Sequence, residues 1–188
     1  MKLPPDHQFT LWGKKIRRSD RNAFDQLFRS FYPILMKFAM RYTRDEASAK
    51  DVVQDCFVKL WQKRTRINPE QSLKSYLYTM VRNSALNLIR DLSDVEVNHE
   101  MANSISEAEV PEVADSSEER LEDFFATWID QLSDRQKEAF ELSRFEGLDH
   151  EEIAEVMNLS PKTVNNHIVG ALRFLRDRYL QHKQQDSR

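Results

Sequence analysis

Residues 150–180 read HEEIAEVMNLSPKTVNNHIVGALRFLRDRYL, and this stretch decides the fold of the second half of the chain. A short segment with helical periodicity is followed by a brief turn and a longer periodic segment. Ser160 before Pro161 marks a helix start, because serine caps a helix and proline suits its first turn. Asp149 and Glu152 have the spacing of a capping box for the shorter helix. The stretch therefore predicts a helix-turn-helix.

The two faces of the longer helix differ in composition. Its predicted buried stripe consists of Val164, Ile168, Ala171, Leu172 and Leu175. The first two turns of the opposite face carry Lys162, Thr163, Asn165, Asn166 and His167. In a helix-turn-helix these turns face the base edges, where Asn can pair with adenine and Thr can touch a thymine methyl. Arg173, Arg176 and Arg178 lie further along, where phosphates are the expected target. An ordinary helical hairpin with a polar outer face is the alternative.

Upstream of this stretch the periodicity continues and then stops. One apolar stripe consists of Leu121, Phe124, Phe125, Trp128, Ile129 and Leu132. Ser133 and Gln136 have the spacing of a second capping box, and Gly147 is a natural helix-ending residue. Residues 94–118 are acidic, hold Pro111 and keep no sustained period. They predict a flexible linker.

Residues 1–93 predict three helices. The first is capped by Ser19 or Asp20 and contains Pro33, which we expect to kink or split it. The second covers about 45–63 and the third about 72–91. The apolar residues of all three keep helical spacing.

These elements together predict an all-α fold. It consists of a first helical domain over 1–93, the acidic linker over 94–118 and a helix-turn-helix domain over 119–188. Only three glycines occur in 188 residues, which disfavours a fold with many turns.

Charge is distributed unevenly along the chain. Residues 1–93 hold 18 Lys and Arg against 9 Asp and Glu, and residues 94–120 hold 1 against 9. The formal net charge of the whole chain is nevertheless only -3. Such asymmetry indicates a polyanion-binding part beside an acidic segment. A solvated basic surface is the alternative.

Composition also limits the possible functions. Cys56 is the only cysteine, so we expect a small core residue in a reducing compartment. The start of the chain lacks the apolar core of a signal peptide, and no apolar run is long enough to span a membrane. The histidines lack metal-ligand spacing and there is no Gly-rich phosphate loop. We therefore expect a cytoplasmic protein with no catalytic residue, no cofactor, no metal and no small-molecule substrate.

Three motifs resemble the extracytoplasmic-function (ECF) sigma factors of the sigma-70 family. Residues 51–61 read DVVQDCFVKLW and resemble the helix with which these proteins dock on the clamp of RNA polymerase. Residues 72–91 read SLKSYLYTMVRNSALNLIRD and resemble the helix that opens and reads the promoter's -10 element, with Tyr76 in place of the usual tryptophan. The helix-turn-helix resembles the domain that reads the -35 element. Gly170 departs from that pattern, because the family often has a basic residue there.

The resemblance implies three groups of site residues. Those for polymerase binding are Asp51, Gln54, Asp55, Val58 and Trp61. Those for the -10 element are Arg64, Arg66, Asn68, Tyr76, Arg82, Asn83, Asn87 and Arg90. Those for the -35 element are Lys162, Thr163, Asn165, Asn166, His167, Arg173 and Arg176. Stacking aromatics, amides and basic groups are what single-stranded bases require.

The implied function is promoter recognition as a non-enzymatic subunit of RNA polymerase. The implied partners are promoter DNA, the clamp helices and flap of core polymerase, and an anti-sigma factor, often membrane-anchored in the family. The combination of TVNNHI with ALRFLR resembles the iron-citrate-regulator-like subgroup, linked to outer-membrane nutrient uptake. One alternative is a helix-turn-helix regulator that binds promoter DNA without joining polymerase. Another is an all-helical interaction adaptor.

Overall fold

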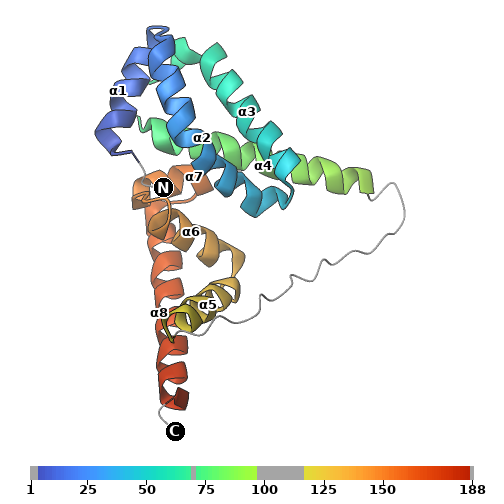
Figure 1. Ribbon diagram of the computed structural model, residues 1–188, viewed down its shortest axis with the longest axis vertical. Coiled ribbons are helices and arrows are strands. Elements are labelled where there is room, and N and C mark those ends of the chain that lie inside the picture. The colour runs from blue at the N-terminus through green and yellow to red at the C-terminus, as the bar shows by residue number, and fades with distance from the viewer. Residues whose placement is uncertain (1–3, 69–70, 97–116, 187–188) are drawn as a thin grey trace. The chain divides into compact units, whose positions relative to one another are not determined.

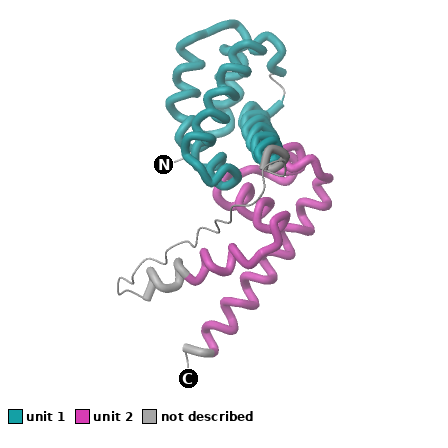
Figure 2. The backbone as a smooth tube through the Cα atoms, turned by 90° about the vertical axis from the view of Figure 1, so that its right-hand side faces the viewer, with its two compact units in different colours: residues 1–101 teal, residues 102–188 magenta. Residues whose placement is uncertain are grey.

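The computed structural model describes residues 4–68, 71–96 and 117–186. Every regular element in these ranges is a helix, which confirms the predicted all-α class. The chain divides into two compact units, residues 1–101 and 102–188 (Figure 2). None of the described helices has the length and apolarity needed to cross a membrane.

The first unit is a helical bundle (Figure 1). Its elements are α1 (Asp6–Arg17), α2 (Arg21–Thr43), α3 (Glu46–Gln62), the 3-10 turn η1 (Arg64–Arg66) and α4 (Leu73–Glu96). α2 packs against both α3 and α4, and α1 packs against α2, α4 and η1. The sequence predicted no helix before Ser19, so α1 is an addition. Its apolar residues recur only about once per turn among basic ones, and their burial against the other helices stabilises it.

One buried ring connects three helices of this unit. Tyr78 of α4 has no exposed surface, and its ring lies 5.4 Å from that of Phe31 and 4.9 Å from that of Phe38, both on α2. Phe9 of α1 contacts Phe31 in turn, at 4.9 Å. All three pairs are edge-to-face, the geometry that the ring quadrupole favours. The rings therefore fix how α1 and α4 are placed on α2.

α2 is a single helix of 23 residues that continues through Pro33. Of the two predicted outcomes, a kink or a split, the split is therefore wrong. Proline removes one backbone donor, but Leu27 and Phe31 before it and Leu35 and Phe38 after it are all buried in the same core. Their burial outweighs the lost hydrogen bond.

The turn between α1 and α2 has a well-defined geometry. Ser19 has a φ of 65°, in the left-handed region. Its N–H donates to the Ile16 carbonyl at 2.8 Å, and the Asp20 N–H donates to the Lys15 carbonyl at 3.1 Å, which is a Schellman motif. The Asp20 carboxylate then accepts from the Ala23 N–H at 3.0 Å. Of the two predicted caps, Asp20 is therefore the one that caps α2.

Cys56 is a core residue of α3, as the sequence predicted. Its Sγ lies 3.7 Å from the Ser84 hydroxyl on α4. Burial raises the pKa of the Cys56 thiol, so it stays protonated at neutral pH.

The second unit is built around one long helix (Figure 1). Its elements are α5 (Ser117–Asp130), α6 (Asp134–Arg144), α7 (His150–Met157) and α8 (Pro161–Asp186). α5, α6 and α7 each pack against α8. A core cluster consists of Trp128, Ile129, Leu132, Phe140, Ala171 and Leu175. The predicted linker lies largely outside the described residues. Its expected limits, residues 94 and 118, fall inside helices, because α4 ends at Glu96 and α5 begins at Ser117.

The predicted capping boxes have different outcomes. The Asp149 carboxylate accepts from the N–H groups of Glu151 and Glu152 at 2.9 and 2.8 Å, and the Glu152 carboxylate accepts from the Asp149 N–H at 3.1 Å. The box at α7 is therefore confirmed. The prediction of a capping box at the start of α6 is wrong. The Ser133 hydroxyl donates to the Gln136 side chain at 3.1 Å and makes no hydrogen bond to the backbone of the helix.

We expect replacement by alanine to have opposite effects on stability at Gly147 and at Gly13. Gly147 has a φ of 60° and open space where a Cβ would lie, so Gly147→Ala suffers only from its backbone conformation. We expect it to destabilise the second unit by about 1 kcal/mol. Gly13 lies inside α1, where a Cβ meets only ordinary contacts at 3.9 Å. Gly13→Ala should stabilise α1 by up to about 1 kcal/mol.

Amide hydrogen exchange of the full chain measures both effects. Protection over α6–α8 reports on Gly147→Ala, and protection over α1 reports on Gly13→Ala. Equal protection changes in the two variants would contradict the conformational explanation.

Candidate DNA and polymerase surfaces

The start of α8 presents most of the predicted base-reading residues to solvent. Lys162, Asn165 and Asn166 are exposed, and His167 is half-buried. Thr163 differs, because its hydroxyl lies 2.8 Å from that of Ser160 and its N–H donates to the same oxygen at 3.1 Å. The Ser160 cap therefore holds Thr163, and the three exposed residues are the freer candidates.

The middle of α8 departs from the predicted stripe at one position. Val164, Ile168, Ala171 and Leu175 are buried, but Leu172 is 52% exposed, so its assignment to the core is wrong. The neighbouring helices cover a narrower face of α8 than the periodicity suggested. Leu172 lies outside that covered face.

Three arginines follow along α8, and two of them have partners on the helix itself. Arg173 and Arg176 are both exposed. The Arg176 guanidinium lies 3.2 Å from the Asp177 carboxylate, a pair exposed to solvent and therefore weak. Arg178 lies over the ring of Phe174 at 5.2 Å. Arg173 and Arg176 remain the better candidates for phosphate contacts.

Gly170, which departs from the family pattern, faces another helix. A Cβ at this position would lie 2.6 Å from the amide nitrogen of Gln136 on α6. A larger residue would have to displace that side chain. Gly170 stands where the family often has a basic residue, and at this position Gln136 of α6 comes close to α8.

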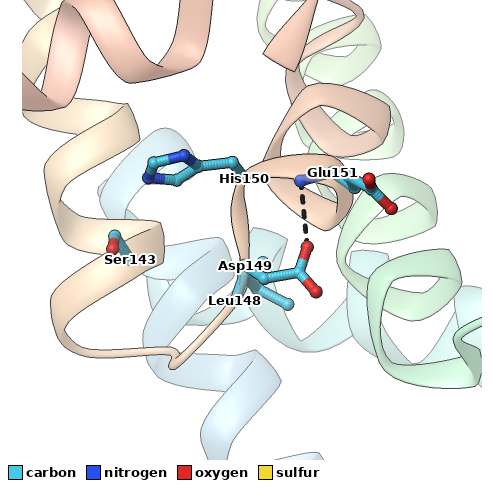
Figure 3. A pocket seen from close by; sticks show the side chains of 5 residues that line it. All are labelled: Ser143, Leu148, Asp149, His150 and Glu151. Carbon is cyan, nitrogen blue, oxygen red and sulfur yellow. Dashed lines mark hydrogen bonds between the residues drawn. The ribbon is translucent and has the colours of Figure 1, made fainter. Parts of the chain in front are cut away.

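A hollow lies at the start of α7 (Figure 3). It is lined by Ser143, Leu148, Asp149, His150 and Glu151. The Asp149 carboxylate already accepts the hydrogen bond from the Glu151 N–H that is drawn in Figure 3. His150 and Glu151 extend in different directions from the start of the helix. Helix capping accounts for this carboxylate without a ligand.

α3 separates a polar face from a buried one. Asp51, Gln54, Asp55 and Val58 are exposed, and Val58 has 53% of its surface in solvent. Val52, Val53, Cys56, Phe57 and Leu60 on the other side are buried. The structure therefore presents four of the five predicted clamp-binding residues together on one surface.

Trp61, the fifth residue of this group, is half-buried and part of the fold. Its ring lies 5.0 Å from that of Phe24 on α2. The Arg64 guanidinium lies 4.6 Å from its centroid. Any contact of Trp61 with a partner would use only its remaining exposed edge.

α4 presents an aromatic and polar face to solvent. Tyr76 is 41% exposed, and Asn83, Asn87 and Arg90 are exposed along the same helix. The Arg90 guanidinium lies 3.4 Å from the adjacent Asp91 carboxylate, and both groups are exposed. This arrangement suits stacking and hydrogen bonding to unpaired bases.

Arg82 differs from the other predicted -10 residues. It is only 7% exposed, and it is not without an interaction partner. A charged side chain so far from water is stable only when it is paired or hydrogen-bonded. In this conformation Arg82 supports α4 rather than presenting its charge on the surface.

The loop before α4 is held by Arg64. Its Nε donates to the Ser19 hydroxyl at 2.9 Å, and its Nη1 donates to the Trp61 carbonyl at 2.8 Å. Arg66 and Asn68 on the same loop are exposed. The sequence predicted all three as base contacts, but only Arg66 and Asn68 are presented to solvent. Arg64 ties the loop to the end of α3 and to the turn between α1 and α2.

Comparison with known proteins identifies the family. Residues 27–94 match the model of Sigma-70 region 2, and residues 125–175 match that of Sigma-70, region 4. The chain belongs to the sigma-70 family. The region 2 match contains most of α2, α3, η1 and most of α4, and the region 4 match contains α6, α7 and more than half of α8. α1 lies outside both matches.

Similar proteins agree with this assignment. The RNA polymerase sigma-H factor of Pseudomonas aeruginosa is 29% identical over 168 residues, which cover 84% of this chain and 86% of that protein. The ECF RNA polymerase sigma-E factor of Escherichia coli K12 is 26% identical, with 84% and 87% covered. These relatives support an ECF sigma factor.

Two solved structures have a similar fold. One is CnrH in complex with the cytosolic domain of CnrY, with a TM-score of 0.62 and 22% identity over 90% of this chain and 96% of that chain. The other is the sigma factor RpoE of Bartonella quintana with the anti-sigma factor NepR, with a TM-score of 0.60 and 22% identity over 83% and 96%.

We predict that Arg64 positions the loop before α4. Arg64→Ala removes two hydrogen bonds and a cation–π contact, so the loop should open more readily by about 1–2 kcal/mol. Arg64→Lys keeps the charge but not the planar fork, and should give an intermediate effect. Amide hydrogen exchange over residues 63–68 measures the opening.

The matched control is Arg66→Ala, which removes an exposed basic residue from the same turn. It should leave the exchange of residues 63–68 unchanged. If Arg64→Ala behaves in the same way as this control, Arg64 does not hold the loop.

Proposed function

We propose that the chain is a non-enzymatic sigma subunit that brings core RNA polymerase to promoters and assists their opening. The exposed face of α3 docks on the polymerase clamp. The loop after η1 and the exposed face of α4 open and read the -10 element, and the start of α8 reads the -35 element. The flap of core polymerase is the proposed partner of the second unit, and the proposed location is the cytoplasm.

The observation that carries this proposal is the placement of Tyr76. Tyr76 is exposed on α4, while Tyr78, two residues later, is fully buried. Residues two apart in a helix point to nearly opposite sides, so the core holds Tyr78 and leaves the Tyr76 ring free to stack on a base. Asn83 and Asn87 are exposed on the same helix.

We further infer an anti-sigma partner, because the solved structure from Bartonella quintana is described as a complex with an anti-sigma factor. The proposed subgroup is the iron-citrate-regulator-like one, on the basis of TVNNHI and ALRFLR in α8. We also propose that the anti-sigma partner is anchored in the membrane. For the chain itself we propose domains over 1–93 and 119–188, joined by an acidic linker.

The test is co-purification with core polymerase followed by run-off transcription. A regulator that binds DNA alone would bind promoters without core polymerase, and an adaptor would support no transcription. A chain that neither co-purifies with core polymerase nor directs transcription would contradict the proposal.

The clamp surface predicts a specific loss in this assay. Gln54→Ala with Asp55→Ala removes polar groups from the exposed face of α3 and should weaken core binding by roughly 2–5 kcal/mol. Helical content should not change, because neither side chain is buried. Lys37→Gln, an exposed change on α2, is the control for general surface effects. Unchanged affinity of the double variant in a competition assay would remove α3 as the docking helix.

The start of α8 predicts a change of specificity rather than of general affinity. Asn166→Ala should alter the preferred -35 bases, by about 1–3 kcal/mol at one position. Arg176→Ala should weaken binding to all sequences alike and lower its salt dependence. Selection from promoter libraries measures both. If the same -35 sequence is selected without Asn165 and Asn166, α8 is not the reading helix.

A further inference from the structure

The turn between α1 and α2 carries a dense group of basic residues. Residues 14–21 read KKIRRSDR. Five of these eight residues are basic, and all five side chains are exposed. We call them the basic ridge, which consists of Lys14, Lys15, Arg17, Arg18 and Arg21. The ridge lies outside both family matches, which begin at residue 27 and residue 125.

The fold holds the ridge in place. Ile16 is buried and the Schellman motif at Ser19 fixes the path of the chain. The hydrogen bond from Arg64 to the Ser19 hydroxyl joins this turn to η1 at 2.9 Å. Because α1 packs against η1, the exposed side chains of Lys63 and Arg66 belong to the same end of the first unit.

The charge of the ridge is not neutralised within the described part of the chain. None of its five basic groups forms an ion pair with a described residue. Two nearby carboxylates are already engaged, and Asp25, four residues after Arg21, is exposed and forms no ion pair with a described residue. The Asp6 carboxylate lies 2.9 Å from the Lys74 ammonium, and the Asp20 carboxylate caps α2. The ridge is therefore a set of like charges that repel one another when no partner is bound.

Helix stabilisation explains only part of this pattern. Basic residues in the last turn of a helix interact favourably with its dipole, which accounts for Lys14, Lys15 and Arg17 at the end of α1. Arg21 is the first residue of α2, whose first turn has no acidic residue. A cation is unfavourable at that end of a helix. The helix dipole therefore does not account for Arg21.

We propose that the basic ridge binds phosphates of promoter DNA beside the segment read by η1 and α4. This inference rests on the proposed function, because it extends the DNA surface of the first unit beyond α4. Protein–DNA interfaces are much more positive than protein–protein interfaces, whose centres are depleted in lysine. The ridge consists of five exposed cations, and the exposed apolar residue beside it on α1 is Leu11, one turn before Lys14. Contacts of this kind position the protein and add affinity at every sequence.

The test compares two double variants with equal charge loss in reconstituted holoenzyme. Lys14→Gln with Arg18→Gln neutralises part of the ridge. Lys37→Gln with Lys50→Gln is the control, on exposed residues of α2 and α3. Lys37 lies 16 residues along α2 from Arg21, a distance of about 24 Å at the helical rise. Neither pair contains a residue assigned above to the -10 or -35 surface.

The measurement is promoter-DNA affinity as a function of salt concentration. The slope of log affinity against log salt should fall by about 1.8 for two lost duplex contacts, or by about 1.4 for single-stranded contacts. The preferred promoter bases should not change, and the control should keep the wild-type slope. Affinity for core polymerase is measured in parallel by competition.

Two outcomes overturn the ridge assignment while the proposed function stands. One is that both double variants have the same slope of log affinity against log salt, while the wild-type holoenzyme still selects promoters. The other is loss of core-polymerase affinity by the ridge variant with an unchanged salt slope, which would make the ridge a protein-binding surface. A wild-type holoenzyme with no promoter preference would overturn the proposed function itself, and this assignment with it.

Discussion

The burial of Tyr78 against α2 is the constraint on which the first unit depends. Its ring lies edge-to-face with Phe31 and Phe38, and Phe9 extends the cluster to α1. A large ring with no exposed surface fixes the rotation of α4 about its axis, because turning the helix would bring the ring into water. The exposure of Tyr76 follows directly from helical geometry. The proposed DNA surface is thus a consequence of core packing.

The α1–α2 turn connects this core to the loop before α4. Ser19 occupies a left-handed conformation that glycine adopts more readily, which costs on the order of 1 kcal/mol. Its hydroxyl accepts from Arg64, which also binds the end of α3 through the Trp61 carbonyl and ring. One arginine therefore joins η1 and the end of α3 to the turn between α1 and α2, 45 residues earlier in the chain. Charged groups near the proposed DNA surface are divided between this structural role and exposed positions such as Arg66.

The second unit shows a similar division of roles along α8. Buried residues such as Val164 and Ala171 bind the helix to α6 and α7, and the remaining face is available to a partner. The Asp149 box and the Ser160 cap fix where α7 and α8 begin. Gly170 permits the approach of Gln136 from α6. The exposed Asn165 and Asn166 are therefore presented by a helix whose start and neighbours are both well defined.

The sequence by itself determined the helical class, the helix-turn-helix with its caps at Asp149 and Ser160, and the polar face of α3. These features depend on periodicity and on interactions between residues close in the chain, which a sequence displays directly. Only the tertiary structure decided that α1 is a helix, that Leu172 is exposed, that Ser133 bonds a side chain, that Arg64 is engaged in the fold and that Arg82 is buried. Apart from the local bond of Ser133 to Gln136, each of these depends on what another part of the fold covers or donates. Periodicity shows that a helix has an apolar face, but the neighbouring helices decide how wide a face is buried and which charges remain in water.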